Sequence, residues 1–323
     1  MRIRSLAAAV AVGTVLVGGL TACGDSDTAA SAGSSASKAA DVAGTPEYQA
    51  ARATALAQFP TPPATKVVAA SVPIAEVLDL LAVPVAGVPS TTTQQLPASL
   101  DGAQRIGTVK SLDVEKIVSL SPDLVIASEG ARSSVAAALA STKTPTAFLK
   151  TENVDDLRFA VDVLSTAFDR EDRGREILAT MDGHLDTLTS AGDGKDTPKV
   201  LALIGAADSF MVMNGNSFLG SLLNKAGADN IAESSLHAKE TFSAVNLENI
   251  IAAAPDVVLV LQSGDQAAGQ AAFDAEVAQN PAWKSLPACQ NQRIHVVDYN
   301  TFGYTSVTGL DTAVPELTGL LHP

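Results

Sequence analysis

The stretch Val114–Ala127, VEKIVSLSPDLVIA, and its second copy at Leu247–Val260, LENIIAAAPDVVLV, decide the fold of this chain. In both copies an apolar helical pattern ends at a Pro-Asp pair and continues as an apolar strand. The copies lie 133 residues apart, and the predicted strand starts Lys66–Val67 and Lys199–Val200 have the same separation. Two matches at one separation predict two similar lobes.

Each lobe is predicted to be an α/β unit, because apolar strands alternate with helical patterns, which is typical of a parallel sheet. Between the lobes, apolar residues at helical spacing from Val154 to Leu188 predict one long or slightly broken linking helix. The predicted fold class is therefore α/β, with two Rossmann-like lobes joined by a long helix. Its predicted parts are an N-terminal lobe at residues 64–152, a linking helix at 153–192 and a C-terminal lobe at 193–323.

The N-terminus has the composition of an export signal. Two arginines precede an apolar run, Leu6–Leu20, that is too short for a comfortable membrane span. The run ends in Leu20–Gly24, LTACG, which resembles the lipobox at which bacteria acylate a cysteine. Residues 1–22 are therefore predicted to be a lipoprotein signal peptide and Cys23 the lipidated residue. The alternative is an ordinary signal peptide with a chance cysteine.

Residues 23–63 are predicted to be a flexible tether, because they are rich in Ser, Ala, Gly and Thr. A short helix over residues 47–58 is expected to interrupt it. The tether and anchor place the body on the extracytoplasmic face of the cell membrane. With Cys23 lipidated, Cys289 has no partner for an intramolecular disulfide, so packing must stabilise the lobes.

Composition limits the function further. The formal net charge of −14 argues against a nucleic-acid partner, because phosphates would be repelled. A hydrophobic content of 46% suffices for a core in each lobe, so a disordered chain is excluded. No Gly-x-Ser-x-Gly, phosphate-binding loop or His-Glu-x-x-His pattern is present, so no enzyme is predicted. A membrane-anchored hydrolase or adhesin is the weaker alternative, and an adhesin does not need two matched lobes.

The lipobox-like ending, the repeated Pro-Asp strand unit and the helical linker together resemble the substrate-binding proteins of iron-siderophore, heme and vitamin B12 ABC importers. The resemblance covers roughly residues 66–321. Within this group the chain is most similar to the heme-binding lipoprotein of the Gram-positive iron-regulated surface determinant system. The segments that carry this likeness are 78–81, 84–89, 95–97, 106–107, 216–220, 226–230 and 301–303.

The resemblance implies a monomer that captures an iron complex and delivers it to an ABC permease and its ATPase. Heme or a ferric siderophore is the expected cargo, with vitamin B12 as the alternative, and no intrinsic cofactor is expected. In the heme protein a Met and a His bind the iron axially, but here those positions fall at Lys110 and about Ser263. Neither is a routine iron ligand.

The candidate ligand residues lie in loops after predicted strands, where open α/β lobes bind ligands. Lys110 and Arg132 are expected to meet the anionic groups of the cargo. Tyr304 is a candidate axial ligand as a phenolate, and otherwise a tyrosine packed at the lobe edge with a solvated hydroxyl. Four scattered histidines do not predict a zinc or manganese site. The other predicted ligand contacts are Phe210, Met213, Phe242 and Ser263.

Docking to the permease is assigned from the resemblance to one glutamate on each lobe. Glu115 matches the first-lobe position, whereas the second-lobe position falls at Asn224. Glu248, the repeat mate of Glu115, is the candidate substitute, although the helix dipole also favours a Glu in a first helical turn.

The lipid anchor is tested by Cys23→Ala. Each buried acyl methylene contributes about 0.8 kcal/mol, so losing the chains should release the protein from cell membranes into the medium. Immunoblots of membrane and medium fractions measure this release, and unchanged membrane association would contradict the anchor.

Overall fold

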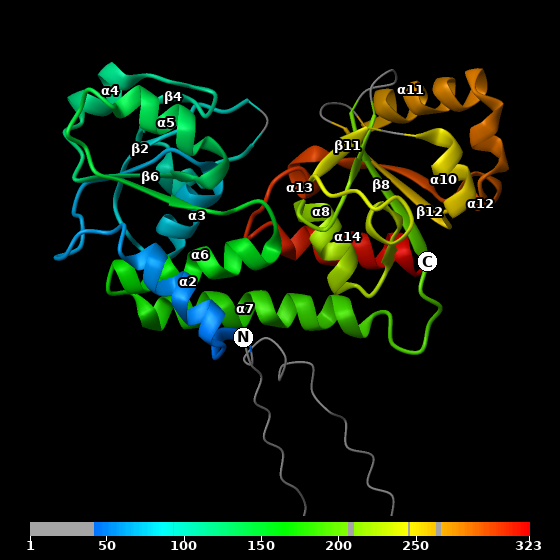
Figure 1. The fold of residues 1–323 in the computed structure, drawn as a ribbon, viewed down its shortest axis with the longest axis horizontal. Helices are drawn as coiled ribbons and strands as arrows, with labels where there is room; N and C mark the ends of the chain where they lie inside the picture. The colour runs from blue at the N-terminus through cyan, green and yellow to red at the C-terminus, as the bar shows by residue number, and fades with distance from the viewer. Residues whose placement is uncertain (1–41, 93, 206–209, 245, 263–265) are drawn as a thin grey trace, which may run out of the picture. The chain divides into compact units, whose positions relative to one another are not determined.

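A computed structural model describes residues 42–323, apart from residues 93, 206–209, 245 and 263–265. The predicted signal peptide, Cys23 and Ser263 therefore lie outside the described residues. Two separate β-sheets flanked by helices confirm the predicted α/β class (Figure 1). Within the described ranges, no helix has both the length and the apolar character needed to cross a membrane.

The first lobe is built on a five-stranded sheet, in the order β3-β2-β1-β6-β7, whose neighbouring strands are all parallel. Val67 and Leu124 face the core that includes α3, whereas Val68 and Val125 face the core that includes α4 and α5. Burial on both faces explains why these strands are continuously apolar. The elements are β1 Val67–Ala69, α3 Val72–Leu80, β2 Val85–Val88, η1 Ala98–Leu100, β3 Gln104–Arg105, β4 Gly107–Thr108, β5 Ser111–Leu112, α4 Val114–Ser119, β6 Leu124–Ser128, η2 Glu129–Ala131, α5 Arg132–Leu139 and β7 Thr146–Leu149.

The second lobe contains a six-stranded sheet in which β11, β9, β8, β12 and β13 are neighbours in that order and β10 also pairs with β8. The central strands are parallel, and β9 and β11 are antiparallel additions at one edge. The elements are β8 Lys199–Ile204, β9 Met211–Met213, α8 Phe218–Lys225, β10 Asp229–Asn230, α9 Ile231–Ser234, β11 Phe242–Ala244, α10 Leu247–Ala253, β12 Val257–Gln262, α11 Gln266–Gln279, η3 Pro281–Ser285, α12 Pro287–Gln290, β13 Ile294–Asp298, α13 Tyr299–Phe302 and α14 Leu310–Leu321.

The repeated joint between helix and strand has the same geometry in both lobes, which confirms the predicted repeat. Ser121 and Ala254 both end their helices with a φ of 49°. The next aspartates accept hydrogen bonds from the backbone of the central strand: Asp123 Oδ2 from Lys66 N, and Asp256 Oδ2 from Lys199 N, each at 2.9 Å. Each aspartate therefore sets the register of two adjacent parallel strands.

The sequence predicts one long or slightly broken helix as the linker, whereas the structure has a hairpin of two packed helices, α6 Val154–Ala167 and α7 Glu171–Ser190. Asp169 has a φ of +54°, a left-handed conformation that ends α6. The helices pack closely at Gly174, where an added Cβ would lie 2.4 Å from Ser165 Cβ. Arg173 Nε donates to Leu80 O at 3.0 Å, and Thr189 Oγ1 donates to Lys225 O at 2.9 Å. Helix α7 thus contacts both lobes (Figure 1).

The end of the predicted tether is folded onto this hairpin. Helix α2, Pro46–Leu56, lies within the region expected to be flexible, although a short helix was expected there. Tyr48 Oη and Arg52 Nε both donate to Asp162 Oδ2 at 2.9 Å, and the Tyr48 ring packs edge-on against Phe159. These contacts with α6 make residues 46–56 part of the body.

The attachment of α2 is tested by Asp162→Ala. Losing the shared acceptor leaves a tyrosine hydroxyl and a guanidinium without their partner, so the free energy of unfolding should fall by about 1–3 kcal/mol. Chemical denaturation measures the change, and limited proteolysis should cut within residues 46–58 first. Asp162→Asn keeps an acceptor for Tyr48 and should lose less; an equal loss in both variants would contradict this account.

Candidate functional site

Three of the predicted ligand residues lie in segments that follow parallel strands, where open α/β sheets bind ligands: Lys110 after β3, Arg132 after β6 and Tyr304 after β13. Phe210, Met213 and Phe242 lie instead at the antiparallel edge formed by β9 and β11. Among the residues that the structure describes, no hydrogen bond, ion pair or ring contact joins any two predicted ligand side chains; only Met213 and Phe242 are paired, as neighbours across two strands. The lobes therefore offer separate contacts rather than one assembled cluster.

Arg132 is not a free cation. Its Nε and Nη2 donate to the two carboxylate oxygens of Glu129 at 2.5 and 2.7 Å, and its guanidinium lies 4.3 Å from the centre of the Phe148 ring. These hydrogen bonds raise the pKa of Arg132 and lower the pKa of Glu129. The pair is neutral overall, so Arg132 offers an anion less charge than the sequence suggested.

Lys110 stands at the tip of the β4–β5 hairpin and is exposed. The hairpin begins at Gly107, with a φ of +88°, where an added Cβ would lie 2.5 Å from the carbonyl oxygen of Ser111. Only glycine suits this turn. Val109, beside Lys110, is also exposed, at 37%. The hairpin thus presents one cation and one apolar side chain.

The second lobe presents an apolar edge on β9 and β11. Phe242 is 44% exposed, as a ligand contact must be, but Met213 is only 2% exposed and lies in the core, so its prediction as a ligand contact is wrong for this structure. Met211 is the exposed methionine, at 41%. Alternation places Met211 and Met213 on one face of β9, and only the packing around that face distinguishes them. Phe210 is half-buried, with its ring 5.6 Å from Phe273.

Tyr304 contacts the first lobe rather than standing free. Its hydroxyl oxygen accepts a hydrogen bond from Gln95 N at 3.3 Å, and its ring lies 6.4 Å from that of Tyr299. Burial raises the pKa of Tyr304, so the phenol holds its proton and is a poor iron ligand until that proton is lost. Tyr304 also lines a pocket of about 440 Å³ together with Glu76 and Gln95.

Glu76, which sequence reasoning missed, fastens the segment after Tyr304 to helix α3. Its carboxylate is 5% exposed and accepts hydrogen bonds from Ser306 Oγ at 2.8 Å and from Val307 N at 3.1 Å. Two more come from Thr308, from its N at 2.9 Å and its Oγ1 at 2.6 Å. Thr305 Oγ1 adds a bond to Thr151 O at 2.7 Å. The available signal was a charged residue at the centre of the otherwise apolar stretch Val72–Leu78, VPIAEVL.

A second missed feature is the carboxylate pair Glu152 and Asp156 at the start of α6. Burial, followed by the nearby charge of Glu152, raises the pKa of Asp156 to about 6. The same helix end touches the second lobe, where Val154 N donates to Ser221 Oγ at 3.2 Å and Lys225 Nζ pairs with Asp155 Oδ1 at 2.8 Å. The sequence signal was three acidic residues within five positions.

The two predicted docking glutamates occupy equivalent places. Glu115 lies in the first turn of α4 and Glu248 in the first turn of α10, and both are exposed. No described residue forms an ion pair with either. Asn224, the other second-lobe position, donates from Nδ2 to Glu233 Oε2 at 3.0 Å.

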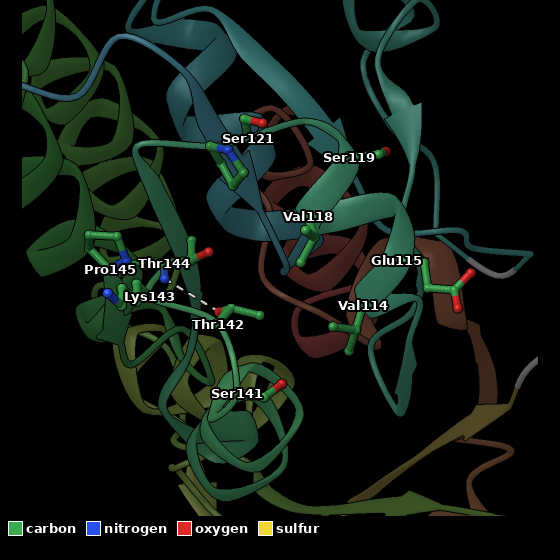
Figure 2. Close-up of a pocket in the computed structure, with 11 residues that line it drawn as sticks. Val114, Glu115, Val118, Ser119, Ser121, Ser141, Thr142, Lys143, Thr144 and Pro145 are labelled. Carbon is green, nitrogen blue, oxygen red and sulfur yellow. Dashed lines mark hydrogen bonds between the residues drawn. The ribbon is translucent and has the colours of Figure 1, made fainter.

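A broad groove of about 780 Å³ lies beside Glu115 on the first lobe. Its floor and walls come from α4 and from the loop between α5 and β7 (Figure 2). Val118, 46% exposed, lies along the groove, with Glu115 toward one end and Lys143 toward the other (Figure 2). No cluster of metal-binding side chains was found anywhere in the described ranges.

One parallel and one mixed β-sheet, each flanked by helices, with a helical hairpin between them and exposed side chains near the strand ends, define a two-lobed binding protein. The family model described as periplasmic binding protein matches residues 67–301. The chain belongs to this family, which confirms the predicted resemblance.

Several known proteins are similar to this chain. An ABC transporter substrate-binding protein from Listeria monocytogenes EGD-e is 27% identical, with a TM-score of 0.73, covering 80% of this chain and 98% of that one. IsdE of Staphylococcus aureus, complexed with heme, is 24% identical with a TM-score of 0.70, covering 80% and 99%. The siderophore-binding protein BauB is 19% identical with a TM-score of 0.62, covering 80% and 93%. The proteins similar to this chain thus include an ABC transporter substrate-binding protein and a heme-complexed protein, and a siderophore-binding protein shares the fold.

The Glu152–Asp156 pair predicts a pH-dependent stability. The folded state holds the Asp156 proton more tightly than the unfolded chain, where the pKa is about 3.9, so its stabilising contribution is complete below pH 4 and is lost as the pH rises through about 6. Asp156→Asn should therefore gain unfolding free energy relative to the parent between these values, as measured by denaturation at a series of pH values. Asp155→Asn is the control for losing a carboxylate from this helix end, and parallel curves for parent and Asp156→Asn would contradict the prediction.

Proposed function

We propose that this chain is the substrate-binding protein of an ABC importer, captures an iron complex, and delivers it to the permease and its ATPase. The main support for this proposal is the family match over residues 67–301. Heme is the first candidate cargo and a ferric siderophore the second. The lipid anchor at Cys23, the monomeric state and the absence of enzymatic activity belong to the same proposal.

Heme is favoured by the character of the exposed side chains. Met211 and Phe242 offer an apolar edge on the second lobe, and Val109 offers an apolar contact on the first. A porphyrin has two apolar faces that gain free energy when they leave water. Lys110, exposed beside Val109, supplies a cation for a propionate. The heme uptake protein IsdE, 24% identical over 262 residues that cover 80% of this chain and 87% of IsdE, supports the same choice.

A ferric siderophore remains the second candidate because many carry carboxylates or catecholates, which need cations. Lys110 and Lys150 are exposed at the strand ends of the first lobe and serve that purpose. Arg132 contributes less, since Glu129 already neutralises it. An anionic cargo would have to open that pair or bind beside it.

The heme proposal has two candidate iron ligands among the described side chains. To bind iron, the Tyr304 hydroxyl must lose its proton, although burial raises its pKa, and its oxygen must give up the hydrogen bond from Gln95 N. Met211 has an accessible thioether, which is an attested heme-iron ligand. We therefore rank Met211 with Tyr304 as a candidate axial ligand.

Hemin titration of the full-length Cys23→Ala protein tests the cargo. We expect a shifted Soret band, and Phe242→Ser should weaken binding by about two- to thirteenfold, since an aromatic contact contributes about 0.5–1.5 kcal/mol. Val42→Ser removes another exposed apolar side chain and is the matched control. Met211→Ala and Tyr304→Phe identify the ligand by loss of the band.

The result also separates the two cargoes. Without a Soret shift, heme is rejected and a panel of ferric siderophores is titrated by quenching of tryptophan and tyrosine fluorescence. Binding of neither hemin nor any siderophore would reject an iron complex as cargo.

A further inference from the structure

The flank of α4 that forms the groove beside Glu115 has an equivalent flank on α10 in the second lobe, and there the protein's own chain covers it. Val114 and Val118 of α4 correspond to Leu247 and Ile251 of α10, each 133 residues later. Val118 is 46% exposed, whereas Ile251 is partly buried against the second-lobe core. Equivalent positions on two equivalent helices therefore have different surroundings.

The difference comes from the connection to the last strand of each repeat, which runs from α5 to β7 in the first lobe and from α11 to β13 in the second. Val125 pairs with Thr146 in the first lobe, and its mate Val258 pairs with Ile294 in the second. Thr146 and Ile294 are 148 residues apart, which is 15 more than the repeat separation of 133. Part of this extra length extends α11, and the rest forms η3 and α12.

In the second lobe the extra chain packs against α10. Trp283 of η3 is 3% exposed and shares a core cluster with Ile250 and Ala253 of α10. Its ring lies 5.4 Å from Phe273, and Ala288 N of α12 donates to Pro255 O at 3.0 Å, at the end of the helix–strand joint. A short helical segment with a large apolar side chain thus covers this flank.

In the first lobe the short loop of residues 140–145 leaves the corresponding flank of α4 open as the groove (Figure 2). At one end stands Glu115, an exposed carboxylate without an ion pair to any described residue. An occupant must therefore supply an apolar side chain beside Val118 and a cation beside Glu115, since both are left unmatched by the described chain.

We propose that this groove receives a short extracytoplasmic segment of the permease that carries an apolar side chain next to a basic one. The inference rests on the proposed docking of Glu115 and extends that contact along α4. Because the second lobe fills its equivalent flank with its own η3, the two lobes present different docking surfaces despite their equivalent glutamates.

Site-specific photo-crosslinking of the full chain in living cells tests the groove without knowledge of the cargo. The photoreactive residue p-benzoylphenylalanine replaces Val118 on one wall and, separately, Ser141 on the other. Both positions lie at the surface, so the variants should fold. Illumination should shift the chain to a heavier band that contains a membrane-spanning permease subunit by mass spectrometry.

Two further positions separate the groove from the docking site itself. The same residue in place of Lys116, exposed next to Glu115 and outside the groove lining, should crosslink to the permease, and in place of Ala179, exposed on α7, it should not. Crosslinking at position 116 without crosslinking at either wall would overturn the groove and leave the docking proposal standing. Absence of crosslinking at all three positions would reject docking at this surface, and wall crosslinks to a second copy of the chain or to another protein would overturn the permease as occupant.

Discussion

The buried carboxylate of Glu76 is the constraint on which the arrangement around the candidate site depends. A carboxylate shielded from water must have its oxygens hydrogen-bonded, and residues 306–308 supply all four bonds. The segment between α13 and α14 is thereby held to helix α3. This position also determines where Tyr304 lies, with its hydroxyl at Gln95. Together with the α6–α7 hairpin, it connects elements that are more than two hundred residues apart in the chain.

The chemistry of the strand ends is less cationic and more apolar than the sequence suggested. Glu129 neutralises Arg132, and Tyr304 holds its proton, so two of the predicted polar contacts are occupied within the protein. The exposed contacts are Lys110, Met211 and Phe242. Such a surface suits an amphipathic ligand with broad apolar faces and few charges better than a highly charged one. This balance is the physical basis for ranking heme ahead of a siderophore.

The two lobes share one local plan and differ in what was added to it. In both lobes a left-handed residue ends the helix, a proline follows, and an aspartate holds the next strand to its neighbour in the sheet. The added η3 and α12 of the second lobe then change the outer surface without changing the sheet. Pseudo-symmetry in the core is thus compatible with asymmetry at the surface that a partner would contact.

The sequence alone determined the fold class, the repeat and the buried faces, since these follow from local hydrophobic periodicity and from a Pro-Asp signal that acts over a few residues. It predicted apolar helices between the lobes but not their hairpin, because the break at Asp169 has no proline or glycine to mark it. Which methionine of β9 is exposed, and whether Arg132 is free, depend on side chains brought in from other elements, and no local pattern carries that information. Burial of Glu76 was likewise decided by residues 306–308, which only the tertiary structure places beside α3.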